Sequence, residues 1–559
     1  MLDDKITVRI LKENNPDSII KVDDYLGNLS VTVKKGSLIP VCQTLRDNSE
    51  LAYNLLLDVC GVDYLGKREK RFEVVYHLYS IDKKQRVRLK VPLSEKEAEV
   101  ETVSRLWNSA NWFERETYEM FGIRFKGHPN LTRLLTHDQF QGYPLRKDYD
   151  PAKRHKCTGV REYLREEFRE LSKERTVLNI GPSHPTMHGV LRLQVLLEGE
   201  TIVDAEAEIG YLHRCFEKMC ETHTYTGVIP YTDRLNYCSS FLNNVGYVMA
   251  VERFMGIEVP KRAQYIRVIL SEFSRIIDHM VCIGANLVDI GALTNFWYLF
   301  RPREEVYSLI ESCCGSRLTT NYTRIGGLSN DVPSDFRERV EKLLNELPRF
   351  IDDVDRLNTK NPIFQNRTRG IGAISRGDAI SWGFTGPCLR AAGVPYDVRK
   401  AYPYYDYDKF EFDIPTGANG DTFDRYMVRM EEMRQSLRII RQAIDNLPEG
   451  SVQSDDKRVS LPAKEQVYTN IEALMNHFKL VMEGILPQEG EIYSYTEAAN
   501  GELGYYIVSD GSKNPYRLKL RPPCFPLYQA FPHMLKGGMV SDAIAILGSL
   551  NIIAGELER

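Results

Sequence analysis

The sequence predicts an α+β protein, with a small α/β domain at the amino end, a charged linker, and a large, mainly α-helical domain that carries small β-sheets. Three observations predict it. Short runs with period-two alternation lie before residue 150, residues 151–175 are dense in charge, and long helical patterns dominate from residue 213 to about 357. We therefore expect domains at 1–150 and 176–559, joined by a linker at 151–175.

The first domain is expected to hold a strand pair and two helices. Residues 71–80 and 85–92 alternate apolar and polar side chains, which is typical of strands with one buried face. We expect these two runs to pair antiparallel. Residues 44–60 and 95–108 carry Leu, Val and Ala at helical spacing, which predicts helices.

The linker and the start of the second domain differ sharply in composition. Residues 151–175 are poor in apolar side chains, as expected of a tether with one solvated helix. Strand-like runs follow at 176–181, 191–198 and 201–208, before the helical patterns begin. Small sheets are therefore expected beside a mainly helical core.

The overall composition excludes several classes of protein. Among 559 residues, 43% are hydrophobic and 27% charged, which is ordinary for a globular chain. The formal charge of −4 gives no reason to expect nucleic acid as a partner. No run approaches eighteen apolar residues, and the start is acidic where a signal peptide is basic, so we expect an intracellular chain without a transmembrane segment of its own.

The eleven cysteines form no C-x-x-C pair. Chelation of zinc or of an iron–sulfur cluster usually needs such a pair. We therefore expect buried, unreactive thiols, and neither a metal nor a flavin bound by this chain.

One helical segment, 264–289, carries polar residues at alternating steps of three and four, so that they share one helix face. A solvated stripe is the alternative, but this face has no Lys and is flanked by large apolar residues. We expect a buried polar face that meets complementary groups from elsewhere. This polar seam consists of Glu272, Arg275, His279, Cys282, Asn286 and Asp289.

Two loops are candidates to meet the polar seam. The first, 181–189 (GPSHPTMHG), carries His184 and His188 between prolines that forbid a regular helix, so it does not have the spacing of a helical zinc site. Two imidazoles that titrate near neutral pH suit proton donation to a ligand. Turn histidines bonded to backbone are the alternative.

The second loop, 230–238 (PYTDRLNYC), crowds two tyrosines, an aspartate and an arginine into eight residues. A tyrosine hydroxyl stays protonated until pH of about 10, so it can hold and protonate a carbonyl without carrying charge. Half-buried packing tyrosines are the alternative.

Ordered motifs in both domains resemble one family. ERETYEMFGI at 114–123, HPNLTRLL at 128–135 and GYPLRKDY at 142–149 look like the signature of the family's C chain. GPSHPTMHG, YLHRCFEK, PYTDRLNY, LVDIGA, GPCLRAAGVPYDVRK and GSLNIIAGELER look like successive signatures of its D chain. Over nearly its whole length the sequence resembles the fused C/D subunit of bacterial respiratory complex I, the proton-translocating NADH:quinone oxidoreductase.

The resemblance implies a quinone site. In the family, a histidine and a tyrosine that match His188 and Tyr237 flank the quinone headgroup, and an aspartate that matches Asp289 pairs with the histidine. Further residues expected near the site or near the terminal iron–sulfur cluster of a neighbouring subunit follow from the same motifs. The supporting residues are His184, Met187 and Arg234, and those near the cluster are Arg214 and His213.

The resemblance also implies a setting. Quinone, either ubiquinone or menaquinone, is the expected substrate, and the chain is expected to work only within the complex. Its expected partners are the subunit that carries the terminal iron–sulfur cluster and the membrane subunit at the quinone entrance. The expected location is peripheral, on the cytoplasmic face of the bacterial inner membrane, with residues 1–150 docking against other subunits.

The D part of this family is similar to the large subunit of nickel–iron hydrogenases, which supplies both a fold expectation and an alternative function. Hydrogenases hold their metal with two C-x-x-C pairs. The matching positions here are Asn236, Ser239, Ile553 and Glu556. Isoleucine cannot ligate nickel, so the sequence disfavours a hydrogenase. A scaffold that has lost its activity is a third possibility, disfavoured by the retained histidine, tyrosine and aspartate.

Five positions depart from the family pattern. Cys215 stands where glycine is usual, and Gly538 where histidine is usual. Aspartate is usual at the other three positions, which are Asn236, Asn551 and Glu558. The loss of carboxylates predicts a pocket that is less acidic than is usual in the family.

Overall fold

The computed structural model describes residues 5–156 and 166–559. Its first part is a five-stranded sheet in the order β1-β2-β5-β4-β3, with helices packed on it. The strands are β1 (Ile19–Tyr25), β2 (Asn28–Val33), β3 (Leu55–Asp63), β4 (Phe72–Ser80) and β5 (Gln85–Leu93). The helices are α1 (Ile6–Asn14), α2 (Leu38–Asp47) and α3 (Ala110–Phe121), and a short parallel pair joins β6 (Glu99–Glu101) to β7 (Arg124–Lys126).

The predicted strand pair is confirmed, because β4 and β5 pair antiparallel from Phe72 opposite Leu93 to Ser80 opposite Gln85. The two predicted helices are wrong. Residues 44–60 span the end of α2 and most of β3, whose residues are all buried, and a short continuous apolar run cannot be told from a helix by periodicity. Residues 95–108 hold β6 and a loop, since edge pairing with β7 outweighs the local spacing.

The predicted linker contains α4 (Glu166–Leu171). The neighbouring stretch 157–165 lies outside the described residues. The proposed boundaries at 150 and 175 therefore stay a prediction.

The second part mixes helices with two three-stranded sheets. The predicted strands are confirmed as β8 (Thr176–Ile180), β9 (Arg192–Glu198) and β10 (Thr201–Glu208). A second sheet consists of β13 (Gly490–Ala498), β14 (Gly501–Ser509) and β15 (Arg517–Arg521). A short pair, β11 (Thr323–Arg324) and β12 (Gly327–Leu328), interrupts the helical stretch.

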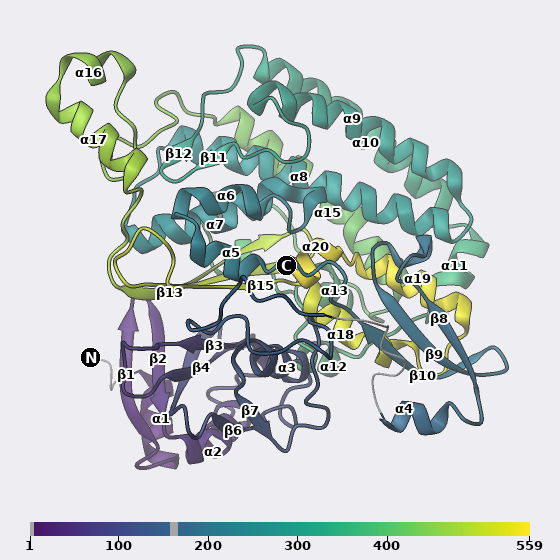
Figure 1. Cartoon of the computed structure of the whole chain (residues 1–559). Coiled ribbons are helices and arrows are strands. Elements are labelled where there is room, and N and C mark those ends of the chain that lie inside the picture. Colours follow the sequence, from purple (N-terminus) through teal and green to yellow (C-terminus); the bar gives the residue numbers. More distant parts are fainter. Residues whose placement is uncertain (1–4, 157–165) are drawn as a thin grey trace.

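Helices dominate this part, and the longest is α8 (Lys261–Asp289), with 29 residues. It packs against α9 and α15, and α10 packs on α9, in the upper half of Figure 1. The longer helices are α6 (Tyr225–Thr232), α7 (Ser240–Met255), α9 (Leu293–Cys314), α10 (Phe336–Asn358), α15 (Thr422–Asp445), α17 (Ile471–Met482), α18 (Cys524–Leu535) and α19 (Val540–Leu550). The shorter ones are α5 (Phe216–Thr222), α11 (Pro362–Thr368), α12 (Arg376–Ser381), α13 (Gly386–Ala391), α14 (Val398–Ala401), α16 (Lys464–Thr469) and α20 (Ala554–Glu558).

The two parts of the chain pack directly on each other, with β13 and β15 lying above the first sheet in Figure 1. Arg517 and Arg521 of β15 donate to the carbonyls of Gly61 and Leu57 in β3, at 3.1 and 3.2 Å. The ammonium of Lys519 lies 2.8 Å from the Glu116 carboxylate of α3. The junction is thus built from buried charge as well as apolar contact.

Among the residues that the structure describes, no helix is both long enough and apolar enough to cross a membrane.

Candidate functional site

The polar seam runs along α8, and nearly all of it is buried. The first three residues, Glu272, Arg275 and His279, have no exposed surface, and the next two are buried as well. Only the carboxylate of Asp289, at the last residue of the helix, keeps 14% of its surface exposed. The prediction of a buried polar face is confirmed.

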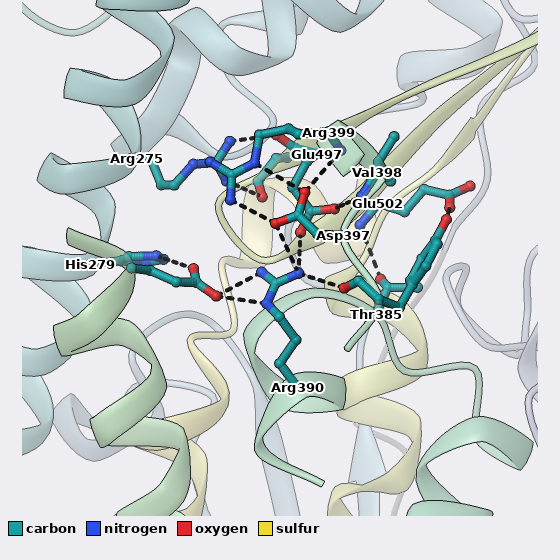
Figure 2. A network of polar contacts seen from close by, with 12 residues as sticks. Arg275, His279, Thr385, Arg390, Asp397, Val398, Arg399, Glu497 and Glu502 are labelled. Carbon is teal, nitrogen blue, oxygen red and sulfur yellow. Dashed lines mark hydrogen bonds and ion pairs between the residues drawn. The ribbon is translucent and has the colours of Figure 1, made fainter. Parts of the chain in front are cut away.

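The amino-terminal half of the polar seam is held by a buried charge network, part of which Figure 2 shows. Glu272 accepts hydrogen bonds from Arg399 at 3.1 Å and from Tyr407 at 2.7 Å. His279 Nε2 lies 2.8 Å from the Glu432 carboxylate. These partners come from α14, the segment after it and α15, and not from the two loops that the sequence offered as candidates.

The network places carboxylates opposite guanidinium groups in the interior. Arg390 contacts Glu432 at 2.8 Å and Glu497 at 2.9 Å, and Arg399 contacts Asp397 at 2.7 Å (Figure 2). Burial alone would raise the pKa of Asp397, but Arg399 and Arg390 outweigh it and lower that pKa to about 2. Burial, aided by Asp397, raises the pKa of Glu497 to about 7. Charges matched in this way fix α8 in place.

The carboxyl-terminal end of the polar seam meets the first loop. His188 Nε2 lies 2.5 Å from Asp289 Oδ2, and the two side chains are 20% and 14% exposed. An imidazole held through Nε2 has Nδ1 left to meet a ligand. From the sequence, this pair was expected only through the family resemblance, and the structure places the two groups in contact.

The loop that carries His188 is fixed by its backbone. A single 3₁₀ turn, η3 (Pro185–Met187), precedes His188, whose φ of 54° lies in the left-handed region. At Gly181, φ is 86°, and a Cβ there would stand 1.9 Å from the Leu191 carbonyl oxygen, so only glycine fits. The buried Met187 anchors the turn in the core. The loop is as stiff as its prolines predict.

The second loop leaves Tyr237 partly open to solvent. Tyr237 begins η4 (Tyr237–Ser239), and its side chain is 43% exposed. Asn236 caps this turn by accepting a hydrogen bond from the Cys238 amide at 3.1 Å. Partial burial, with Cys238 and Asp278 nearby, raises the pKa of the Tyr237 phenol, so the hydroxyl stays a donor across the physiological range.

The two loops pack against the same short segment near the carboxyl end. A Cβ added to Gly189 would lie 3.1 Å from the Cβ of Ala554. A Cβ added to Gly555 would lie 2.7 Å from the Arg234 carbonyl oxygen. Consecutive residues, 554 and 555, therefore touch the histidine loop and the tyrosine loop. Gly555 is needed for this close approach, whereas a side chain at Gly189 would be tightly packed.

Two cationic groups lie beside this segment. Arg214 donates to the Arg234 carbonyl at 2.7 Å. Burial, and then the nearby charge of Arg234, lower the pKa of Arg214. His213 Nδ1 lies 2.7 Å from the Glu558 carbonyl oxygen. Burial works to lower the pKa of His213, but its hydrogen bond with Cys215 prevails and raises that pKa to about 9. The raised pKa favours the charged form of His213 at neutral pH, and an arginine stays charged there even when its pKa is lowered.

The remaining predicted site residues are held within their own loops. His184 is exposed, and its Nδ1 lies 2.6 Å from the Thr186 hydroxyl. Arg234 donates to the Pro230 carbonyl at 2.5 Å. His184 Nδ1 also accepts from the Thr186 backbone amide at 3.4 Å, which matches the alternative of a turn histidine bonded to backbone.

Asp278, one position before His279 on α8, was not predicted from the sequence. Its carboxylate, 1% exposed, accepts from the Asn236 amide at 2.7 Å and from the Asn551 amide at 2.5 Å. Two of the departures from the family pattern thus meet on one carboxylate. The signal was present in the sequence, because an amide can donate to a carboxylate and an aspartate cannot.

The departure at Cys215 also has a structural consequence. Cys215 precedes α5 with φ at 57°, a conformation that favours glycine, the usual residue. The hydrogen bond from His213 is the largest influence on its thiol and lowers its pKa, although burial opposes this. The thiol therefore loses its proton more readily than an ordinary cysteine.

Comparison with known proteins identifies the family of the chain. Residues 31–155 match the respiratory-chain NADH dehydrogenase 30 Kd subunit family, and residues 289–559 match the 49 Kd subunit family. The C/D subunit of the NADH-quinone oxidoreductase of Bdellovibrio bacteriovorus is 52% identical over 547 residues, which covers 96% of each chain. The chain belongs to the family of fused C/D subunits of NADH-quinone oxidoreductase.

Two further relatives are named as subunits of the same enzyme. The C/D subunit of Acidiphilium cryptum is 41% identical over 545 residues, covering 93% of this chain and 91% of its own. A D-type NADH-quinone oxidoreductase subunit of Sorangium cellulosum is 52% identical over 391 residues, covering 70% of this chain and 97% of its own. As a member of the fused C/D family, the chain is an oxidoreductase subunit whose partners are other complex I subunits.

Proposed function

We propose that this chain forms the quinone-headgroup site of its NADH-quinone oxidoreductase, with His188 and Tyr237 as donors to the two quinone oxygens and Asp289 as the partner of His188. The observation that carries the proposal is the 2.5 Å contact between His188 Nε2 and Asp289 Oδ2. This contact lies at the carboxyl-terminal end of the polar seam, where both side chains are partly exposed to solvent. The packing of both loops on residues 554 and 555 supports it.

The proposed roles follow from the chemistry of quinone reduction. Two electrons and two protons together convert the two carbonyl oxygens of the quinone into hydroxyls, and negative charge develops on those oxygens as electrons arrive. An imidazole and a phenol can stabilise that charge and supply the protons. Asp289 would hold the imidazole in one orientation through its contact with Nε2 and pass on the proton that replaces the one His188 donates.

The cationic groups near the carboxyl end suggest the direction from which electrons come. We infer that Arg214 and His213 face the terminal iron–sulfur cluster of a neighbouring subunit, where fixed positive charge stabilises the reduced cluster. The support is that neither side chain has a carboxylate hydrogen-bond partner within the described residues; each bonds a backbone carbonyl. The membrane subunit at the quinone entrance is the second proposed partner.

The proposed setting is the cytoplasmic face of the bacterial inner membrane, with ubiquinone or menaquinone as substrate. Residues 1–150 would dock on other subunits, and 151–175 would tie them to the site-bearing part at high effective concentration. The buried contacts between β3 and β15 support a fixed relation between the two parts.

A hydrogenase function is not supported by the side chains at the matching positions. Asn236 is engaged with Asp278, and Ile553 offers an aliphatic side chain without a donor atom. Glu556 accepts a hydrogen bond from the Cys524 amide at 2.9 Å. Thiolates, which nickel prefers, are missing from these positions.

The test compares quinone reduction with an upstream reaction in the assembled complex. Tyr237→Phe and His188→Ala should each lower NADH:quinone turnover by about 10²- to 10⁴-fold, the usual contribution of a positioned proton donor. NADH:ferricyanide turnover, which bypasses the quinone site, should stay at the parental rate. Tyr468→Phe is the matched control, because Tyr468 is 78% exposed on α16. Parental quinone turnover in the first two variants would refute the assignment.

A further inference from the structure

A cavity lies at the junction between the two parts of the chain. Its volume is about 410 Å³, within the usual range for a small-molecule site. The first part contributes residues of α1, β4 and β5 and their loops, and the second contributes Arg253 of α7, Tyr402 and two tyrosines of β13. The region is at the lower left of Figure 1, where β13 passes over the first sheet.

The lining of this junction cavity is strongly basic. Among the described residues that line it there is no Asp or Glu, and the basic residues are Lys5, Lys84, Arg86, Arg88 and Arg253. Arg86 is neutralised, because it forms two 2.8 Å contacts with the buried Glu502. Lys5 pairs with Asp24. Arg88 shares the Glu491 carboxylate with Lys90, whereas Lys84 and Arg253 have no carboxylate partner among the described residues.

The floor of the cavity holds polar atoms that lack partners within the described residues. Arg88 is 3% exposed and donates through Nε to Ser30 at 2.8 Å, but its Nη1 has no hydrogen-bond partner there. Its ion pair with Glu491 is long, at 3.4 Å. His77, 4% exposed, also has no such partner for Nε2. Buried polar atoms without partners are costly, and Arg88 Nη1, which can only donate, points to a missing acceptor.

The rim carries charge from both parts. Lys84 is exposed in the turn between β4 and β5. Arg253 is exposed near the end of α7, and its guanidinium donates to the Ser494 hydroxyl at 3.3 Å rather than to a carboxylate. A ligand that reaches both rim cations and the Arg88 floor must carry negative charge at more than one point.

We propose that the junction cavity binds a small organic polyanion, with phosphate or carboxylate groups at two or more positions, and that the bound anion joins the two parts of the chain. Guanidinium forks suit both kinds of oxyanion. The tyrosine rings do not favour an aromatic ligand, because Arg86 stacks on Tyr495 and His77 stacks on Tyr493.

A cation is the competing occupant of this region. Ligand atoms of Asp58, Cys60 and His77 lie within 4.8 Å of one another beneath the cavity. The Lys519 ammonium, however, is 3.9 Å from Asp58 and already supplies positive charge there. Burial is the main cause that lowers the pKa of His77, and the positive charge of Arg88 adds to it. A divalent cation would add to this charge, whereas an anion would offset it.

The test is calorimetric titration of the full-length chain at low salt with inorganic pyrophosphate and, separately, citrate. At least one should bind the parent, and Lys84→Gln and Arg253→Gln should each weaken that binding by about tenfold, as the loss of one charge-assisted contact does. Lys464→Gln, at an exposed lysine on α16, is the matched control and should bind as the parent does.

The outcomes separate the ligand classes. Binding of pyrophosphate alone assigns a phosphorylated ligand, binding of citrate alone assigns a polycarboxylate, and binding of both assigns a site open to either. The proposal is overturned if neither anion binds at about 10 mM, or if both rim variants bind as tightly as the control. Bound anion should also raise the temperature of unfolding of the parent more than that of the rim variants. Failure here would leave the proposed quinone site untouched, since the two share no residue.

Discussion

The two ends of α8 carry the same kind of polar stripe in different surroundings. At the amino-terminal half, Glu272 and Arg275 have no exposed surface. Glu272 is matched by buried groups from α14 and α15, and Arg275 donates to Glu272 and to two carbonyls of β13. At the carboxyl-terminal end, Asp289 meets a loop histidine, and both groups keep contact with solvent. One helix thus joins a fully buried charge network around Glu272 and Arg275, the sealed half, to the partly solvent-exposed pair of His188 and Asp289, the open end.

This contrast separates structural from functional charge on one helix. A buried charge without a partner is costly, so the sealed half must be complete before the chain is stable. A partly exposed pair can lack some hydrogen-bond partners within this chain, because water or a ligand can supply them. We therefore expect stability to depend on the sealed half and quinone turnover on the open end.

The largest stability effect should come from Glu272→Gln. This change removes a carboxylate that faces Arg399 and Arg275 in the interior and leaves buried positive charge uncompensated. The expected loss is about 3–5 kcal/mol in the free energy of unfolding. Urea titration of the purified chain measures it.

The matched control for that change is Glu431→Gln on α15. Glu431 is 40% exposed and lies 3.4 Å from Arg434. An exposed pair of this kind contributes less than about 1 kcal/mol. If Glu272→Gln costs no more than the control, the sealed network does not stabilise the chain as described.

The polar face of α8 was predictable from the sequence, but the residues that form hydrogen bonds with it were not. Helical spacing is local, so residues 272–289 reveal a shared polar face by themselves. Arg399 and Glu432 are more than a hundred positions away, and only the folded chain brings them to α8. The strand pair β4–β5 was also local and correct, whereas β3, buried on both faces, has no alternation and was taken for a helix.

The next effect concerns Asp278, which lies between the two ends. Asn236→Asp would place a second carboxylate where an amide now donates to Asp278 at 2.7 Å. The expected loss is about 1–3 kcal/mol at neutral pH, because like charges repel and a hydrogen bond is lost. Adding Asp278→Asn should restore most of it, since the donor and acceptor then exchange places. A double variant that is less stable than Asn236→Asp would contradict the account of this contact.

The candidate site was predictable in part. His188, Tyr237 and Asp289 were identified by resemblance, and the structure brings the histidine and the aspartate into contact. The donor chemistry of Asn236 and Asn551 was readable from the sequence, but their shared partner was not, and each was interpreted only as a lost charge. Their meeting on Asp278 depends on three segments far apart in the sequence.

A smaller effect should appear in the pH dependence of stability. Burial raises the pKa of Glu556 from its usual 4.5 to about 7. Between these values the folded chain keeps a proton that the unfolded chain has lost, so the parent should lose stability as pH rises from about 4.5 to about 7. The slope from this group is at most about 1.4 kcal/mol per pH unit. Glu556→Gln should flatten the profile by that amount, and an unchanged profile would show that Glu556 is ionised in the folded chain.

The smallest stability effect should come from the open end. His188→Ala removes a side chain that is 20% exposed and pairs with Asp289, so the free energy of unfolding should change by less than about 1 kcal/mol. Urea titration beside Glu272→Gln tests the comparison directly. A loss of about 3 kcal/mol or more would place His188 with the sealed network rather than with the site.

The most direct test of the proposed site is a double-mutant cycle on quinone turnover by the assembled complex. The variants are His188→Ala, Asp289→Asn and the two together, each normalised to NADH:ferricyanide turnover. If Asp289 acts through His188, each single change should slow quinone reduction and the double variant should be no slower than His188→Ala. Losses that multiply in the double variant, or parental quinone turnover in all three, would contradict the account.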